Sequence, residues 1–294
     1  MGMKDILKKL RKYEIRIRKA INSQMQGDFH SVFKGSGLEF DDVRQYQYGD
    51  DVRSIDWNVS AKGHGTFVKT FKEEKEQTVF LILDVSASQE IGVPGKQKLD
   101  IGKEICALLG ISAIKESSQV GLICFSDQKE KYVKPGKGIK HSYNITSSIF
   151  NLKPKSTKTN LSKAMKYVLE MIKRKSIMIL ISDFIDEDYD HHLKALARMH
   201  DLVVIHIADK RETEMPKLGI IPLYDQESKK TMWVNTSSAS FRKTIENTYG
   251  KNQAHLEELC KKNQANYTLI RTDEDYVPKL IKLFKVRNKS RRSG

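Results

Sequence analysis

The sequence has few of the residues that build disulfide frameworks or disordered chains. Its 294 residues include only three cysteines and six prolines, and no apolar run approaches the roughly 18 residues that cross a bilayer. An odd number of dispersed cysteines argues against a disulfide framework, and we expect them to be small buried hydrophobic residues. The basic N-terminus lacks the apolar core of a secretory signal. These absences predict a globular, cytoplasmic protein without a transmembrane segment.

Several catalytic and cofactor-binding motifs are also missing. No Gly-x-x-x-x-Gly-Lys-Ser/Thr loop occurs, and the segment Gly92–Lys96 is too short to form one. The eight histidines form no His-Glu-x-x-His motif, and neither a Cys-x-x-Cys pair nor a Gly-x-Ser-x-Gly elbow is present. The sequence therefore gives no support for bound ATP, for zinc or for a hydrolase triad, and we expect a protein that is not an enzyme.

Most of the net positive charge lies at the two ends. The chain has 52 Lys and Arg against 37 Asp and Glu, a net charge of +15. Residues 1–25 hold eight basic and two acidic residues (+6), and residues 279–294 hold seven basic residues and no acid (+7), which leaves +2 for residues 26–278. An anionic membrane or nucleic acid would therefore meet the ends rather than a basic groove in the body.

The two charged ends are expected to differ in structure. Residues 1–26 have the 3.6-residue apolar period of a basic amphipathic helix. This helix either packs on the body, with its lysines in solvent, or lies on an anionic membrane, which would make the protein peripheral to that membrane. Residues 279–294 are expected to form a basic tail.

The middle of the chain falls into two regions. Residues 27–75 are dense in Gly, Asp and aromatic residues and predict short strands and turns rather than helices, with ion pairs between Asp and Arg side chains. From residue 78, apolar runs of strand length alternate with segments of helical period. The expected strands are 78–83, 119–125, 131–133 (an edge strand), 176–181, 202–207 and 267–270. The expected helices are 99–115, 138–151, 160–174, 189–199, 238–262 and 275–285.

This alternation predicts an α/β fold with a doubly wound, mostly parallel sheet covering residues 76–278. Helices would lie on both faces, because continuous apolar strands are buried on both sides. Residues 218–235 interrupt the pattern and predict a hairpin insertion.

Polar side chains follow two of the predicted buried strands. Asp84, Ser86 and Ser88 leave the first, and Asp183 leaves the third. In such a sheet, ligands bind beyond the carboxyl ends of the strands, so these side chains are expected to meet there. Carboxylates and hydroxyls suit Mg²⁺ or Mn²⁺ rather than zinc, and two carboxylates leave such an ion able to accept an Asp or Glu from a partner protein. The alternative is that the serines cap the next helix and the aspartates bond loop amides.

The same residues resemble a known metal site. Asp84-Val-Ser86-Ala-Ser88, Thr159-Asn160-Leu161 and Ser182-Asp183 are similar to the metal-ion-dependent adhesion site of von Willebrand factor A domains. In that site the serines and a loop threonine contact the ion, and the two aspartates often act through water. The resemblance implies a ligand set of Asp84, Ser86, Ser88, Thr159 and Asp183. Thr157 is an alternative to Thr159, because the sequence does not fix the register of the loop.

Longer motifs resemble the bacterial family called domain of unknown function 58. They are Gly37–Arg44, Tyr48–Arg53, Ile55–Asn58, the Asp84 motif, and Ala208–Glu212 followed by Pro216, Gly219 and Asp225. The family is commonly encoded beside a MoxR-type AAA+ ATPase and is thought to assist in activating or assembling other proteins. Gln89 departs from the family pattern, which often has Met there, but this position is not a ligand. The resemblance implies a von Willebrand A-like interaction module that works with such an ATPase.

Two other functions stay open at this point. A peripheral membrane or nucleic-acid binder would use the basic termini, and its binding would weaken steeply with salt. A Mg²⁺-dependent phosphohydrolase of the haloacid-dehalogenase type would also place an aspartate after the first strand. That class usually has a second acid two residues later, where this chain has Ser86.

Overall fold

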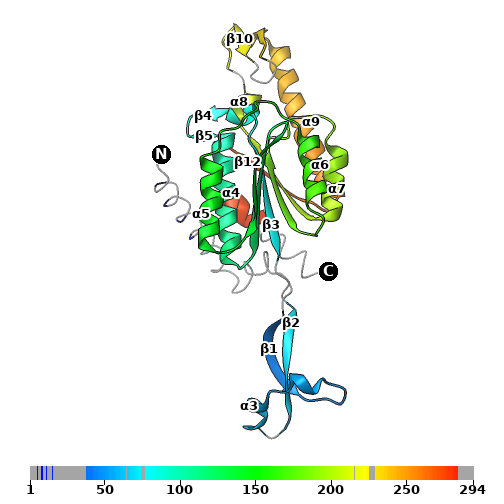
Figure 1. Ribbon diagram of the computed structural model, residues 1–294. Helices are drawn as coiled ribbons and strands as arrows, with labels where there is room; N and C mark the ends of the chain where they lie inside the picture. The colour runs from blue at the N-terminus through cyan, green and yellow to red at the C-terminus, as the bar shows by residue number, and fades with distance from the viewer. Residues whose placement is uncertain are drawn as a thin grey trace.

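Figure 1 shows the computed structural model, which describes residues 38–63, 65–73, 77–214, 216–224 and 229–283 and the isolated positions 5, 8, 11 and 15. Its body is a six-stranded sheet in the order β12-β9-β8-β3-β6-β7. Five strands are parallel, and β7 pairs antiparallel with β6 at one edge. The strands are β3 (Thr78–Asp84), β6 (Gln119–Phe125), β7 (Lys129–Gly136), β8 (Ile177–Ser182), β9 (Asp201–Ala208) and β12 (Asn266–Arg271).

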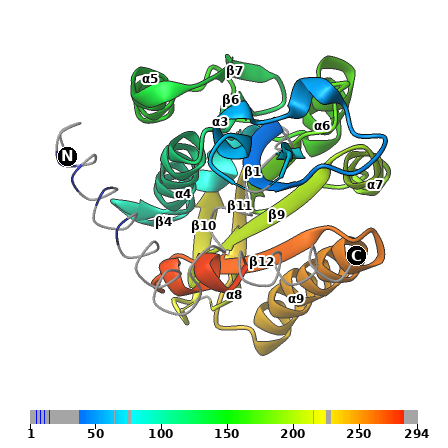
Figure 2. The ribbon, with the colours of Figure 1, turned by 90° about the horizontal axis from the view of Figure 1, so that it is seen from below.

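Helices cover both faces of this sheet (Figure 2). On one face lie α4 (Lys98–Lys115), α5 (Gly138–Phe150) and a helical segment over residues 277–283. On the other lie α6 (Leu161–Met171), α7 (Asp190–Met199) and α9 (Ala239–Lys262). The predicted doubly wound, mostly parallel α/β sheet is therefore confirmed.

The strand β3 shows why the sequence folds in this way. Successive side chains of a strand point to opposite faces, so Leu81 joins the core beneath α4, and Ile82 joins the core beneath α6 and α7. Both are at most 1% exposed. A strand buried on both sides has no polar face, which explains the continuous apolar runs in the sequence.

Residues 38–73 form an extension at the end of the body where the parallel strands begin (Figure 1). β1 (Leu38–Gln45) and β2 (Phe67–Glu73) pair antiparallel, as expected for strands and turns. Between them lie a 3-10 turn, η1 (Val52–Ser54), and a one-turn helix, α3 (Trp57–Ser60), where helices were not expected. The Asp56 carboxylate nucleates this turn by accepting the N–H groups of Asn58 and Val59.

The predicted ion pairing in this extension is also found. The guanidinium of Arg44 lies 2.7 Å from the carboxylate of Asp50. The pair fixes the turn after β1, because Asp50 also accepts the N–H of Gln47 at 2.8 Å.

Smaller elements lie at the opposite end of the sheet. They are η2 (Ala87–Glu90), the short strands β4 (Gly92–Val93) and β5 (Lys96–Gln97), α8 (Lys210–Thr213), and the hairpin of β10 (Ile220–Tyr224) and β11 (Thr231–Asn235). The last of these is the hairpin predicted within residues 218–235, and it projects outward at the top of Figure 1.

The structure moves the expected boundary of the basic C-terminal tail and describes little of the basic N-terminal segment. The helical segment at 277–283 crosses the expected boundary at residue 278, and Leu280 and Leu283 are buried in the core. Residues 279–283 therefore belong to the folded body, because Leu280 and Leu283 are part of the core on this face of the sheet. Residues 284–294 lie outside the described residues, as does the N-terminal helix except for positions 5, 8, 11 and 15, which are helical. Among the described helices, none has both the length and the apolar composition that a bilayer crossing needs.

His200, at the end of α7, should make the stability of the protein depend on pH. His200 is 3% exposed, and burial lowers the pKa of its imidazole, so the folded protein favours the neutral ring. The unfolded chain takes up this proton first, and stability is lost as the pH falls below about 6.5.

We expect urea unfolding to show a steeper loss for the wild type than for His200→Gln below that pH. The difference in slope should be at most about 1.4 kcal/mol per pH unit. Parallel slopes for the two proteins would contradict the assignment.

Candidate functional site

The structure brings Asp84 and Asp183 together at the carboxyl end of the sheet. Asp84 ends β3, and Asp183 follows β8, which pairs directly with β3. The two side chains are 0% and 2% exposed. The hydroxyl of Ser182 donates to Oδ2 of Asp84 at 2.7 Å and ties the two strand ends together. The expected meeting of these carboxylates is therefore found.

Ser86 and Ser88 face the same cluster. The Ser86 hydroxyl donates to Oδ1 of Asp84 at 2.7 Å and lies 3.1 Å from the Ser88 hydroxyl. Ser86 stands at the start of η2, yet its side chain makes no capping hydrogen bond. The helix-cap alternative therefore does not describe Ser86. The second part of that alternative, a bond from an aspartate to a loop amide, is present, because Asp84 also accepts the backbone N–H of Ser86 at 3.0 Å.

The loop before α6 lies against the same turn. The N–H of Ala87 donates to the carbonyl of Thr157 at 2.9 Å, which holds this loop beside the Asp84 segment. Thr159 is half-buried in the loop. Thr159 remains a predicted ligand, with Thr157 as its alternative, because the contact joins backbone atoms and leaves the choice of hydroxyl unchanged.

Lys98 is the central residue that sequence reasoning missed. It begins α4, its side chain is 0% exposed, and its ammonium lies 2.7 Å from Oδ2 of Asp183. The same ammonium donates to the carboxylate of Glu212, from α8. Glu212 stood in a recognised motif, but no sequence signal joins it to a lysine 114 positions away. Such a pairing exists only after β3, β8 and β9 have come side by side.

The buried charges of this cluster set the ionisation of its members. Burial, and then the charge of Asp183, raises the pKa of Asp84 to about 7. Burial also disfavours the Asp183 carboxylate, but the Lys98 ammonium outweighs it and lowers that pKa. For Glu212 burial prevails, and its pKa is raised despite Lys98.

The donor set of the cluster suits a divalent cation. With Asp84 ionised, the carboxylates of Asp84, Asp183 and Glu212 exceed the Lys98 ammonium by two negative charges, and because the pKa of Asp84 is raised to about 7, a bound cation would have to displace the proton of Asp84. Within the described residues, no group of three or more His, Cys, Asp and Glu side chains is placed to hold a metal. A cation at Asp84 and Asp183 would therefore need the neighbouring hydroxyls as ligands, which is the chemistry that Mg²⁺ accepts.

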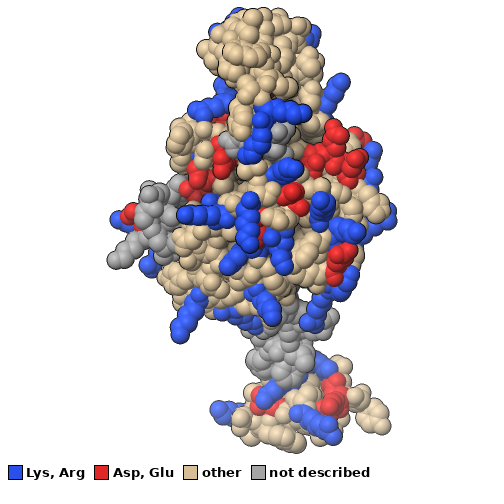
Figure 3. Space-filling view, turned by 45° about the horizontal axis from the view of Figure 1, so that its top comes forward, with Lys and Arg blue, Asp and Glu red and all other residues tan. Residues whose placement is uncertain are grey.

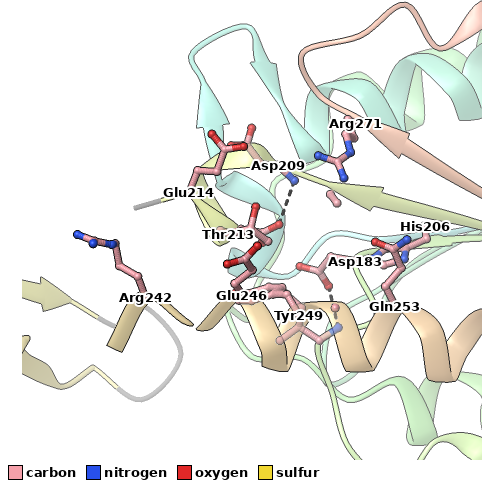
Figure 4. A pocket seen from close by; sticks show the side chains of 14 residues that line it. Asp183, His206, Asp209, Thr213, Glu214, Arg242, Glu246, Tyr249, Gln253 and Arg271 are labelled. Atoms are coloured by element: carbon pink, nitrogen blue, oxygen red, sulfur yellow. Dashed lines mark hydrogen bonds between the residues drawn. The ribbon is translucent and has the colours of Figure 1, made fainter. Parts of the chain in front are cut away.

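A cavity of about 510 Å³ has Asp183 in its lining (Figure 4). It lies at the carboxyl ends of β8, β9 and β12, beside α8 and α9. Its lining includes Glu212, Tyr249 and Arg271, and His206, which is neutral at pH 7 because burial lowers the pKa of its imidazole to about 4. The cavity therefore gives a ligand or partner access to Asp183 and Glu212 at the carboxyl end of the sheet.

Comparisons with known proteins find both sequence relatives and similar solved structures. Uncharacterised proteins of Mycobacterium bovis (Mb1516) and Mycobacterium tuberculosis (Rv1480) are each 24% identical to this chain over 288 residues, which is 97% of this chain and 90% of theirs. Among solved structures, the conserved hypothetical protein BatB of Bacteroides thetaiotaomicron is similar with a TM-score of 0.44 and 15% identity, over 72% of this chain and 99% of that one. The SpRpn10 VWA domain is similar with a TM-score of 0.41 and 9% identity, over 70% of this chain and 94% of that one.

The family assignment rests on a match to more than half of the chain. The sequence model described as "Protein of unknown function DUF58" matches residues 42–255. This range includes the Asp84 motif, Lys98, Asp183 and Glu212. The chain belongs to the DUF58 family.

Proposed function

We propose that this protein is a non-catalytic interaction module that docks a partner through a bound Mg²⁺ or Mn²⁺ ion. The proposed ligands are Asp84, Ser86, Ser88, Thr159 and Asp183. The observation that carries the proposal is the buried cluster in which two carboxylates and two serine hydroxyls meet at the carboxyl end of the sheet.

The surrounding side chains hold the proposed ligands in place. Ser182 fixes one oxygen of Asp84, and Lys98 holds Oδ2 of Asp183, so neither carboxylate turns freely. When bound, the ion would supply a coordination position for a carboxylate oxygen from another protein. The partner would therefore present an Asp or Glu side chain at this end of the sheet.

The resemblance to the DUF58 family suggests which partner to examine first. A MoxR-type AAA+ ATPase encoded in the same organism is the candidate, and assistance in protein activation or complex assembly is the corresponding role. The identity of the partner rests on the resemblance alone.

A pull-down experiment tests the docking proposal. Immobilised full-length protein is incubated with extract, or with the purified ATPase, in Mg²⁺ and separately in EDTA. We expect a partner that is retained only in Mg²⁺ and is lost with Asp84→Ala. Glu187→Ala is the control, because Glu187 is an exposed acid in the loop after Asp183.

The two variants show whether the partner docks through the proposed ion site. Retention by Glu187→Ala together with loss by Asp84→Ala supports docking through the site. Equal recovery by the wild type and Asp84→Ala in Mg²⁺ would show that the partner does not use the ion.

A further inference from the structure

The hairpin of β10 and β11, here called the apolar hairpin, exposes large apolar side chains on both faces. Pro222 and Trp233 are cross-strand partners on one face, together with Ile220 and Tyr224, and Met232 lies on the other. Trp233 is 71% exposed, Ile220 68%, Met232 59% and Tyr224 58%. A hairpin in water ordinarily keeps one polar face, so this surface is suited to an apolar environment.

The base of the apolar hairpin is fixed to the body. Thr236 is fully buried, and its N–H donates to the carbonyl of Gly219 at 2.8 Å. Its hydroxyl accepts the N–H of Leu218 at 3.0 Å, and Arg242 of α9 donates to its carbonyl at 3.1 Å. The strands therefore project from a firm anchor, beyond the rest of the body, as Figure 1 shows.

The charges beside the apolar hairpin are mostly basic. Residues 216–224 and 229–245 include five basic side chains and no acidic one, Asp225 and Glu227 between the strands reduce the sequence total from +5 to +3, and Glu214 and Glu246 lie beside Arg242 at the base. Figure 3 shows the outer cap in tan, with blue side chains beside and below it. The five basic residues are Lys217, Lys229, Lys230, Arg242 and Lys243.

We propose that the apolar hairpin binds the surface of a bilayer that contains anionic phospholipids. Trp233 and Tyr224 have apolar rings with one polar group, the composition that favours the boundary between headgroups and acyl chains. Ile220 and Met232 supply apolar area to bury, and the neighbouring lysines attract anionic headgroups. The lysines beside these side chains complement anionic headgroups, and this charge complementarity favours lipid as the occupant.

This contact has a consequence for the rest of the molecule. The apolar hairpin and the cluster at Asp84 lie at the same end of the sheet, so membrane binding would turn that end toward the bilayer. The membrane contact uses none of the proposed metal ligands, and its residues lie outside the basic termini.

Tryptophan fluorescence of the full-length protein tests this contact directly. The chain has two tryptophans, Trp57 in the β1–β2 extension and Trp233 in the apolar hairpin. In Trp57→Phe, vesicles of phosphatidylcholine with phosphatidylglycerol should shift the Trp233 emission to the blue, and pure phosphatidylcholine vesicles should not. In Trp233→Phe, the emission of Trp57 should stay unchanged with both kinds of vesicle.

Co-sedimentation with the same vesicles provides the second measurement. The double variant Ile220→Ser with Trp233→Ser should bind anionic vesicles at least about tenfold more weakly than the wild type. The matched control is Trp57→Ser, because Trp57 is 68% exposed and lies at the other end of the body, and its binding should equal that of the wild type.

Two results would overturn the proposal. Binding that is equally strong in the double variant, together with an unshifted Trp233 emission in Trp57→Phe, would assign the membrane contact to the basic termini. Absence of binding to anionic vesicles would show that the apolar hairpin serves a different partner.

Discussion

Replacing Lys98 by methionine should lower the free energy of unfolding by about 3–5 kcal/mol, the cost of breaking a buried ion pair from one side. Methionine has a similar length, so the packing against the start of α4 changes little. What is lost is the ammonium that neutralises Asp183 and Glu212, which are themselves 2% and 6% exposed. Urea unfolding followed by circular dichroism measures the change.

Two further variants separate this electrostatic effect from loss of packing. Adding Glu212→Gln to Lys98→Met removes one of the stranded carboxylates, so the double variant should be more stable than the sum of the single changes predicts, with a coupling of about 1–3 kcal/mol. Lys166→Met is the surface control, because Lys166 pairs with Glu170 at 4.0 Å with both side chains 64% exposed. That change should cost less than about 0.5 kcal/mol. A cost below 1 kcal/mol for Lys98→Met would show that the buried charges do not depend on the lysine.

The regular part of the fold could be predicted because its signals are local. The strand β6 coincides with the expected range 119–125, and β3 differs from its expected range by one residue. A strand that is buried on both faces has apolar residues at successive positions, and turns with Gly or polar residues follow it. The meeting of Asp84 with Asp183 also follows, because residues after parallel strands share one edge of the sheet.

The remaining features depend on contacts between distant segments. Lys98 looks like an ordinary solvated residue at the start of a helix, and only the packed sheet shows that it is enclosed by Asp183 and Glu212. The apolar hairpin is similar, because the sequence predicts a hairpin over 218–235, whereas only the structure shows that Trp233 and Ile220 lie in solvent. Local patterns indicate that a side chain avoids or prefers water, and they do not indicate which neighbours it meets.

The proposed ion site should appear as a stabilisation that depends on Asp84. A ligand that binds only the folded protein at 100 times its dissociation constant raises the free energy of unfolding by about 2.7 kcal/mol. We therefore expect Mg²⁺ at about 100 times its dissociation constant to raise the stability of the wild type by this amount. Asp84→Asn should show no such increase, because the amide lacks the negative charge.

Without Mg²⁺ the order of the two proteins should reverse. The carboxylate of Asp84 is buried beside Asp183, and its pKa is raised to about 7, so its ionisation costs stability as the pH rises through that value. At pH 8 in EDTA, Asp84→Asn should be more stable than the wild type, because the asparagine side chain places no buried charge beside Asp183. Asp183→Asn should behave in the opposite way and lose stability, because it removes the partner of Lys98. Urea unfolding of the three proteins with and without Mg²⁺ measures all of these changes. If Asp84→Asn lowers stability equally in both conditions, Asp84 serves the fold alone and the ion site must be abandoned.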